Sequence, residues 1–195
     1  TGMAAPPEVK TATVFVDGQT HVKTMITIAN PQARTTYLRF VHHGRDGALI
    51  GETTRELEGN RTLSANIRDL FDRTATGSVA VLSDEGFVLT AIRTTRNDRG
   101  EDLLTVAPVV YDTGKENTSD FTIPRVEIGG GYTTQIVLLN PSEQAAKGVI
   151  KFLSVTGEPL LVDGTTSEIP YVVAPNGAFV WESPTGEPVT ETGFA

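Results

Sequence analysis

The chain has 195 residues, a formal net charge of −8 at pH 7 and no cysteine. The acidic balance disfavours a general nucleic-acid binder, because it repels phosphate. The absence of cysteine excludes cysteine–zinc modules and disulfide-stapled miniproteins. The 28 threonines, 19 glycines and 11 prolines favour strands and tight turns over helices. No apolar run approaches the roughly 20 residues that cross a bilayer, and residues 1–7 do not resemble a signal peptide.

An internal repeat is the strongest signal along the chain. His21–Pro31 aligns with Gly131–Pro141, and both segments are apolar strands that end at Asn-Pro. Proline cannot donate to a β-ladder and biases the residue before it away from helix, so Asn-Pro ends a strand. Further matches follow at an offset of 110 to 116 residues: Leu38–Phe40 with Ile150–Phe152, Asp46-Gly47 with Thr156-Gly157, Leu57–Asn60 with Val173–Asn176, and Thr76–Val79 with Thr192–Ala195.

One segment of the first repeat favours a helix. In Ser64–Phe71, apolar residues recur at Ile67, Leu70 and Phe71, which is the spacing of one helix face. Ser64 is a plausible N-cap. We expect one or two turns of helix whose apolar side covers an open end of the first core.

The two repeats differ in length. After Val79 the first continues through Val81-Leu82, Phe87–Ile92 and Leu103–Ala107, which we interpret as about three further strands. The second repeat has no counterpart of these strands in the sequence, so we expect either that the sequence stops short of them or that another chain supplies them. Residues 112–120 are polar and lack apolar periodicity, so they are typical of a linker. The sequence therefore predicts an all-β chain of two tandem Ig-like antiparallel β-sandwich units (residues 1–111 and 121–195), the second lacking its C-terminal strands, with one short helix in the first.

Two stretches resemble a known class of repeats. Gly129–Leu160 (GGGYTTQIVLLNPSEQAAKGVIKFLSVTGEPL) is similar to repeats in large secreted and surface proteins of environmental bacteria, notably acidobacteria. Leu63–Phe71 (LSANIRDLF), followed by Ser78–Val109, resembles them as well. The resemblance implies an extracellular Ig-like sandwich repeat that serves as a building or interaction module. It brings no catalytic motif to this chain, and the missing last third of the second unit departs from its pattern.

The sequence contains no convincing catalytic or metal-binding arrangement. His42 and His43 are consecutive strand residues that point to opposite faces, and His21 begins another strand, so we expect no shared metal site. Asn97–Asp102 lacks the spacing of a calcium loop and is typical of a hairpin turn with Gly100 at positive φ. Gly129–Gly131 precedes a strand and not a helix, so it is a turn and not a phosphate loop. We therefore expect no enzymatic activity and no cofactor.

Charge and aromatic residues indicate where a partner could dock. Residues 1–115 contain 13 basic and 14 acidic residues, whereas residues 116–195 contain 3 and 10. A solvated surface would explain this asymmetry. Alternatively, an acidic second unit of one copy could face the arginines of another. The candidate docking residues are Arg93, Arg96 and Arg99 near one hairpin, and Phe179, Trp181 and Phe194 on the open side of the second unit.

These features favour a non-enzymatic structural or interaction module, secreted, on the cell surface or in the periplasm of a bacterium. We expect a protein partner or neighbouring subunit, for which strand addition to the second unit is one route, and no nucleic-acid partner or direct membrane span. One alternative is a carbohydrate-binding module of a secreted enzyme, with Tyr132, Tyr171 and Trp181 as candidate ring platforms, although Trp181 favours a core position. The other is an accessory subunit docked on the extracytoplasmic side of a membrane complex.

Overall fold

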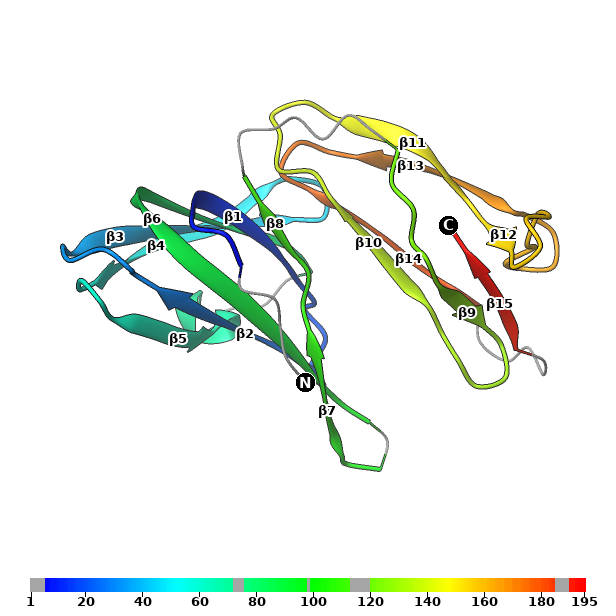
Figure 1. Ribbon diagram of the computed structural model, residues 1–195, viewed down its shortest axis with the longest axis horizontal. Helices are drawn as coiled ribbons and strands as arrows, with labels where there is room; N and C mark the ends of the chain where they lie inside the picture. The colour runs from blue at the N-terminus through cyan, green and yellow to red at the C-terminus, as the bar shows by residue number, and fades with distance from the viewer. Residues whose placement is uncertain (1–5, 72–75, 98, 113–119, 185–189) are drawn as a thin grey trace.

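The computed structural model describes residues 6–71, 76–97, 99–112, 120–184 and 190–195, and it confirms the all-β fold class. Figure 1 shows the strands gathered into two groups, which we call the first half (residues 6–112) and the second half (residues 120–195). The first half contains β1 (Val9–Val16), β2 (Val22–Ala29), β3 (Thr36–Gly44), β4 (Leu49–Leu57), β5 (Thr62–Asn66), α1 (Ile67–Leu70), β6 (Gly77–Arg96), β7 (Asp102–Val106) and β8 (Val109–Tyr111). The second half contains β9 (Val126–Ile128), β10 (Gln135–Leu139), β11 (Ala146–Lys151), β12 (Leu153–Ser154), β13 (Glu168–Val173), β14 (Ala178–Glu182) and β15 (Glu191–Phe194).

The first half is organised around β6, a strand of 20 residues. Its N-terminal part pairs antiparallel with β1 and β3, and its C-terminal part, Val88–Arg96, pairs with β2 and β7. The complete order on one side is β4-β3-β6-β1-β8, while β5 pairs with β2 on the other. A single strand therefore serves two sheets, and the core of the first half lies between them.

The prediction that Val81-Leu82 and Phe87–Ile92 are separate strands is wrong, because both lie in β6. The intervening residues Ser83–Gly86 form a bulge within β6: Thr11 pairs with Leu82 and Val9 with Phe87, so these four residues lie opposite one residue of β1. The register of β6 against β1 shifts between Val9 and Thr11, close to the point where β6 passes from one sheet to the other. A Cβ atom on Gly86 would lie 1.9 Å from the Glu8 carboxylate, so the exposed Glu8 side chain would have to move to accept it.

The short helix α1 closes one end of the first core. Ile67, Leu70 and Phe71 are all buried and belong to the core cluster, as predicted. The predicted cap is wrong: the helix begins at Ile67 after Asn66, and no side chain caps it. Ser64 instead lies in β5, where its hydroxyl is 3.0 Å from that of Thr27. Cross-strand pairing of β5 with β2 therefore overrides the local capping signal.

The second half repeats the pairing of the first. β11 pairs with β13 as β3 pairs with β4, and β10 pairs with β14 as β2 pairs with β5. β15 pairs with both β12 and β9, just as the N-terminal part of β6 pairs with β3 and β1. This correspondence supports the interpretation of two related units. Among the described residues, the part of β6 from Val88 onward, β7 and β8 have no counterpart in the second half.

Asn30 organises the strand end in the first half. The buried side chain lies in the first Asn-Pro motif, where its amide nitrogen is within hydrogen-bonding distance of three backbone carbonyl oxygens. They belong to Arg34, Leu57 and Glu58, at 2.9, 3.1 and 3.2 Å. Its Oδ1 atom accepts a hydrogen bond from the backbone N–H of Gln32 at 3.0 Å. One side chain thereby replaces the ladder partners that are lost where the strand stops.

Asn140 does the same in the second half. Its amide nitrogen reaches the carbonyl oxygens of Gln144, Val173 and Ala174 at 2.6, 3.2 and 3.1 Å. Its Oδ1 atom accepts a hydrogen bond from the N–H of Ser142 at 3.2 Å. The Asn-Pro signal in the sequence thus marks a buried polar network as well as a strand end.

These networks correct the repeat alignment. Asn30 with Arg34 and Asn140 with Gln144 give a constant offset of 110 residues into β3 and β11. Phe40 then corresponds to Ile150 and not to Phe152, so the predicted match of Leu38–Phe40 is displaced by two residues. A shift of two keeps every side chain on its own face of the sheet, and hydrophobic pattern alone cannot detect it.

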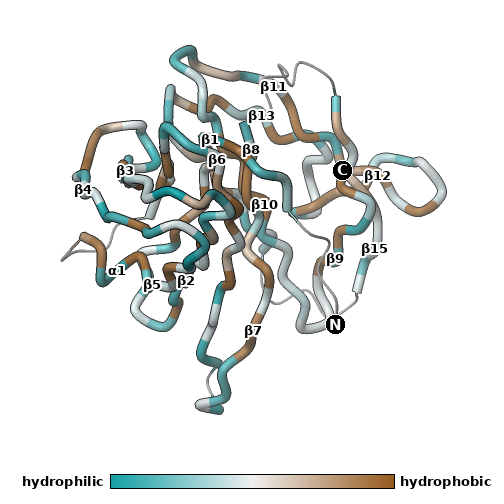
Figure 2. Tube along the Cα trace, turned by 60° about the vertical axis from the view of Figure 1, so that its left-hand side comes forward, coloured by the Kyte–Doolittle hydropathy of each residue, from teal (hydrophilic) through white to brown (hydrophobic). Residues whose placement is uncertain are grey.

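The predicted turns at the hairpin tip and the glycine run are confirmed. Gly100 has φ +80°, and Asn97 Oδ1 accepts hydrogen bonds from the N–H groups of Arg99 and Glu101. Gly129–Gly131 all have positive φ and form a turn before β10. Figure 2 shows the β6–β7 hairpin projecting from the body of the molecule. Most of the predicted linker, residues 113–119, lies outside the described residues. Within the described part of the chain, no helix is long and apolar enough to cross a membrane.

Leu70→Ala should lower the free energy of unfolding by about 2–5 kcal/mol, because it opens a cavity under α1. Urea denaturation followed by circular dichroism measures this change. Leu104→Ala is the matched control, since Leu104 is 71% exposed on β7. Equal effects of the two substitutions would show that α1 does not close the core.

Asn30→Ala and Asn140→Ala should each lower the free energy of unfolding by about 1–3 kcal/mol, since buried carbonyl oxygens lose their donor. The same denaturation experiment applies. Gln144→Ala is the control, because only the backbone oxygen of Gln144 takes part in the network. A loss no larger than that of the control would contradict the proposed role of the networks.

Candidate functional site

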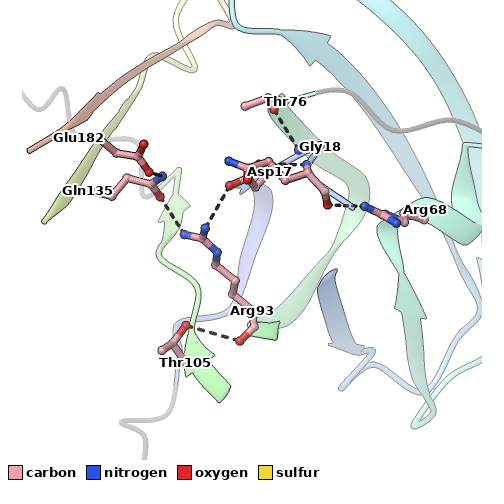
Figure 3. Close-up of polar contacts among 9 residues, drawn as sticks. Asp17, Gly18, Arg68, Thr76, Arg93, Thr105, Gln135 and Glu182 are labelled. Atoms are coloured by element: carbon pink, nitrogen blue, oxygen red, sulfur yellow. Dashed lines mark hydrogen bonds and ion pairs between the residues drawn. The ribbon is translucent and has the colours of Figure 1, made fainter. Parts of the chain in front are cut away.

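The most developed polar site lies where the two halves meet, and Arg93 is at its centre (Figure 3). The Arg93 Nη2 atom is 3.0 Å from Asp17 Oδ2, and Nη1 donates to Gln135 Oε1 at 2.8 Å. The Asp17 side chain is 4% exposed and that of Arg93 is 27% exposed. Arg93 therefore joins a buried carboxylate of the first half to a side chain of the second.

Local structure explains why these groups meet. Arg93 follows Leu89 and Ala91 on the same face of β6, so it points toward the end of the first core. A guanidinium there requires an anionic partner. Asp17 directly follows β1, and its Oδ1 atom accepts a hydrogen bond from the N–H of Gln19 at 3.1 Å. That turn is held further by Gly18, whose N–H donates to a threonine hydroxyl, as Figure 3 shows.

The series of polar contacts continues into the second half. Gln135 Nε2 donates to Glu182 Oε1 at 2.8 Å, which links β10 to β14. Acceptors and donors thus alternate from Asp17 through Arg93 and Gln135 to Glu182 (Figure 3). These contacts fix the position of the second half against the first, although the buried Nε atom of Arg93 has no hydrogen-bond partner among the described residues.

A second set of contacts joins two turns, Arg45–Gly47 of the first half and Ala174–Gly177 of the second. The N–H of Ala178 donates to the Arg45 carbonyl oxygen at 3.1 Å, and Arg45 Nη2 is 3.3 Å from the Val180 carbonyl oxygen. The Ser78 hydroxyl donates to the carbonyl oxygen of Asn176 at 2.6 Å. We call these contacts, together with the Arg93 cluster, the junction.

Two glycines allow the turns of the junction to approach closely. A Cβ atom on Gly47 would lie 2.1 Å from the Pro175 carbonyl oxygen, and one on Gly177 would lie 2.6 Å from that of Arg45. Gly47 also has φ +81°. Gly157, the counterpart of Gly47 in the second half, has φ +86° but nothing within 4 Å of its Cβ position. The same glycine turn therefore makes contact in one half and is open in the other.

The histidines do not converge. His42 is buried, and its ring centroid lies 5.2 Å from that of Phe71, whereas His43 is the next residue along β3 and faces the other side. Burial lowers the pKa of the His43 imidazole. His21 is exposed. Across the described residues, no group of three or more histidine, aspartate or glutamate side chains is placed to hold a metal ion.

Hydrogen bonds perturb one acidic group outside the junction. The N–H groups of Thr166 and Thr165 and the Thr165 hydroxyl lower the pKa of Asp163. These residues form a surface turn between β12 and β13. The shift therefore belongs to a local turn and marks no reactive group.

The structure separates the predicted docking arginines. Arg93 is engaged within the chain, as described above. Arg96 is exposed on β6, and Arg99 is exposed at the hairpin tip, where it pairs with Glu101 at 3.3 Å. Sequence reasoning found Arg93 but not its partners Asp17 and Gln135, because residues distant along the chain carry no pattern that pairs them.

The predicted docking aromatics line the second core. The Trp181 ring packs against Phe152 with centroids 4.8 Å apart, and that of Phe179 packs against Tyr171 at 5.9 Å. Both are partly buried against the core cluster, and Phe194 is half-buried in β15. The core position favoured for Trp181 agrees with this packing.

A cavity of about 400 Å³ opens on one side of the second core. Ile136 and Leu138 of β10 line it, together with residues of β11, Ile123 and Ala195. The sequence indicated an unfinished side to this unit, but it could not show which strand borders the opening.

Comparison of the chain with protein-family models, with curated proteins and with solved structures returned no match.

Arg93→Met should lower the free energy of unfolding by about 1–3 kcal/mol. This is less than the cost of about 3–5 kcal/mol for breaking a fully buried pair, because Arg93 is partly exposed. Adding Asp17→Asn should recover part of the loss, since no buried carboxylate then remains unpaired. Arg96→Met on the same strand is the control, and a double-mutant cycle by urea denaturation measures the coupling. Zero coupling between Asp17 and Arg93 would contradict the assigned ion pair.

Proposed function

We propose that this chain is a non-enzymatic structural and interaction module, whose two sandwich-like halves are held in a fixed relative position. The observation that carries the proposal is the junction. Halves joined only by a flexible linker need no direct contacts. Here the backbone hydrogen bond from Ala178 to Arg45, the hydrogen bond from Arg93 to Gln135 and two tightly packed glycines join them.

The proposal includes an Ig-like tandem repeat and an extracytoplasmic location in a bacterial surface protein, appendage or envelope assembly. The matched Asn30 and Asn140 networks and the repeated strand pairing support the tandem repeat. The resemblance to secreted and surface repeats supports the location. We further propose that a protein partner docks on the second half by strand addition.

The carbohydrate-binding alternative receives less support. It requires exposed aromatic platforms, but Trp181 and Tyr171 pack against Phe152 and Phe179. Of the three candidates only Tyr132 is an exposed residue, at 56%. The accessory-subunit alternative uses the same docking surface as the structural proposal and differs from it only in the identity of the partner.

Spin labels on the two halves should report one narrow distance distribution in pulsed electron paramagnetic resonance. The chain has no cysteine, so Glu56→Cys and Val155→Cys provide two unique, exposed attachment sites. Gly47→Ala should broaden the distribution, because its Cβ would collide with the backbone of Pro175. Gly157→Ala is the matched control: it has the same positive φ but no neighbour to meet.

A broad distribution in the unsubstituted, doubly labelled chain would contradict a rigid module. Equal distributions for Gly47→Ala and Gly157→Ala would show that the junction does not set the separation.

A further inference from the structure

One edge of β10 lacks a partner strand. β10 pairs with β14, and among the described residues no strand pairs with its other side. The hydrogen bonds from Asn140 N to Gly177 O and from Ser183 N to Thr134 O set the alternation of this pair. The backbone groups of Gln135, Val137 and Leu139 therefore point to the outer edge.

The outer edges of β13 and β14 are protected. β13 carries Pro170 opposite Val149, in the phase where a backbone N–H would point outward. Proline at that position blocks strand addition. The outer edge of β14 is occupied at Ala178 and Val180 by Arg45. The outward-facing positions of β10 hold no proline and no charged residue, so this edge remains competent to pair.

The open cavity lies beside the same edge. Ile136 and Leu138 alternate with the outward-facing positions and line it. In the first half the equivalent place is filled, because β6 pairs with β2 and buries Phe87, Leu89 and Ala91. The cavity is therefore a place for alternate apolar side chains of an added strand.

The acidic charge of the second half indicates which residues the added strand carries. The chain from residue 116 onward carries 3 basic and 10 acidic residues. The strand that fills the equivalent place in the first half carries Arg93 and Arg96 beyond its apolar part. A basic strand would be drawn to the second half and would dock faster than a neutral one.

We propose that β10 accepts an added β-strand, antiparallel to it, with apolar side chains at alternate positions and lysine or arginine among the others. The apolar side chains fill the cavity, and the strand backbone pairs with Gln135, Val137 and Leu139. This inference rests on the proposed interaction module and specifies the edge and the class of partner.

The chain itself supplies a probe, a synthetic peptide with the sequence of Phe87–Arg96 (FVLTAIRTTR). We expect saturable binding to the full chain, measured by the fluorescence of Trp181, the only tryptophan. Hydrogen exchange at the amides of Gln135, Val137 and Leu139 should slow at least tenfold. A peptide of the same composition without the apolar alternation is the control and should not bind.

Val137→Pro should abolish peptide binding, because it removes an outward N–H and leaves the pairing with β14 in place. Val172→Pro is the matched control: it adds a proline to the β13 edge that Pro170 already blocks, and should leave binding unchanged. A peptide N-methylated at Thr90 removes a donor from the peptide side. It tests the same contact if Val137→Pro does not fold.

Three outcomes would overturn the inference. They are no saturable binding, binding that survives both Val137→Pro and N-methylation, and slow exchange of the three amides in a chain that is monomeric and free of peptide. If exchange is already slow and sedimentation shows a dimer, the occupant is a second copy. If the peptide does not bind but the spin-label distance distribution is narrow, only the strand-addition inference is wrong. A broad distance distribution contradicts the rigid module, whether or not the peptide binds.

Discussion

The architecture depends on the requirement that each backbone N–H and C=O in a sheet finds a partner. In the first half β6 meets this requirement for four neighbours, since it pairs with β1 and β3 and then with β2 and β7. Its side chains also supply the centre of the core, including Val81, Phe87 and Leu89. The second half repeats this pairing only as far as β15. Among the described residues, no strand pairs with the other side of β10, and the cavity lies beside it.

Strand ends meet the same requirement by a different means. Asn30 and Asn140 each bring one side-chain amide to three backbone carbonyl oxygens where the ladder stops. A buried amide is tolerated because its donors and its acceptor are all engaged. The two networks hold the following strands in the same register, so they account for the close match of the halves more directly than the hydrophobic core does.

The junction uses the repeated turn asymmetrically. Gly47 packs against the Pro175 backbone, whereas the equivalent Gly157 faces open space. One copy of the turn can therefore bind a neighbouring unit while the other stays available. Arg93, held by its ion pair with Asp17 in the first half, adds a hydrogen bond to Gln135 of the second. Such an arrangement suits a module whose function depends on the relative position of its parts.

Short-range patterns in the sequence were sufficient for the fold class, the strand ends at Asn30 and Asn140, the buried face of α1 and the turn at Gly100. Each of these depends on residues close together in the chain. Tertiary structure decided the continuity of β6, the place of Ser64 in β5, the two-residue shift at Ile150 and the meeting of Arg93 with Asp17 and Gln135. These features depend on pairing between residues that are distant in sequence, and local propensity gives way when such pairing satisfies more backbone groups.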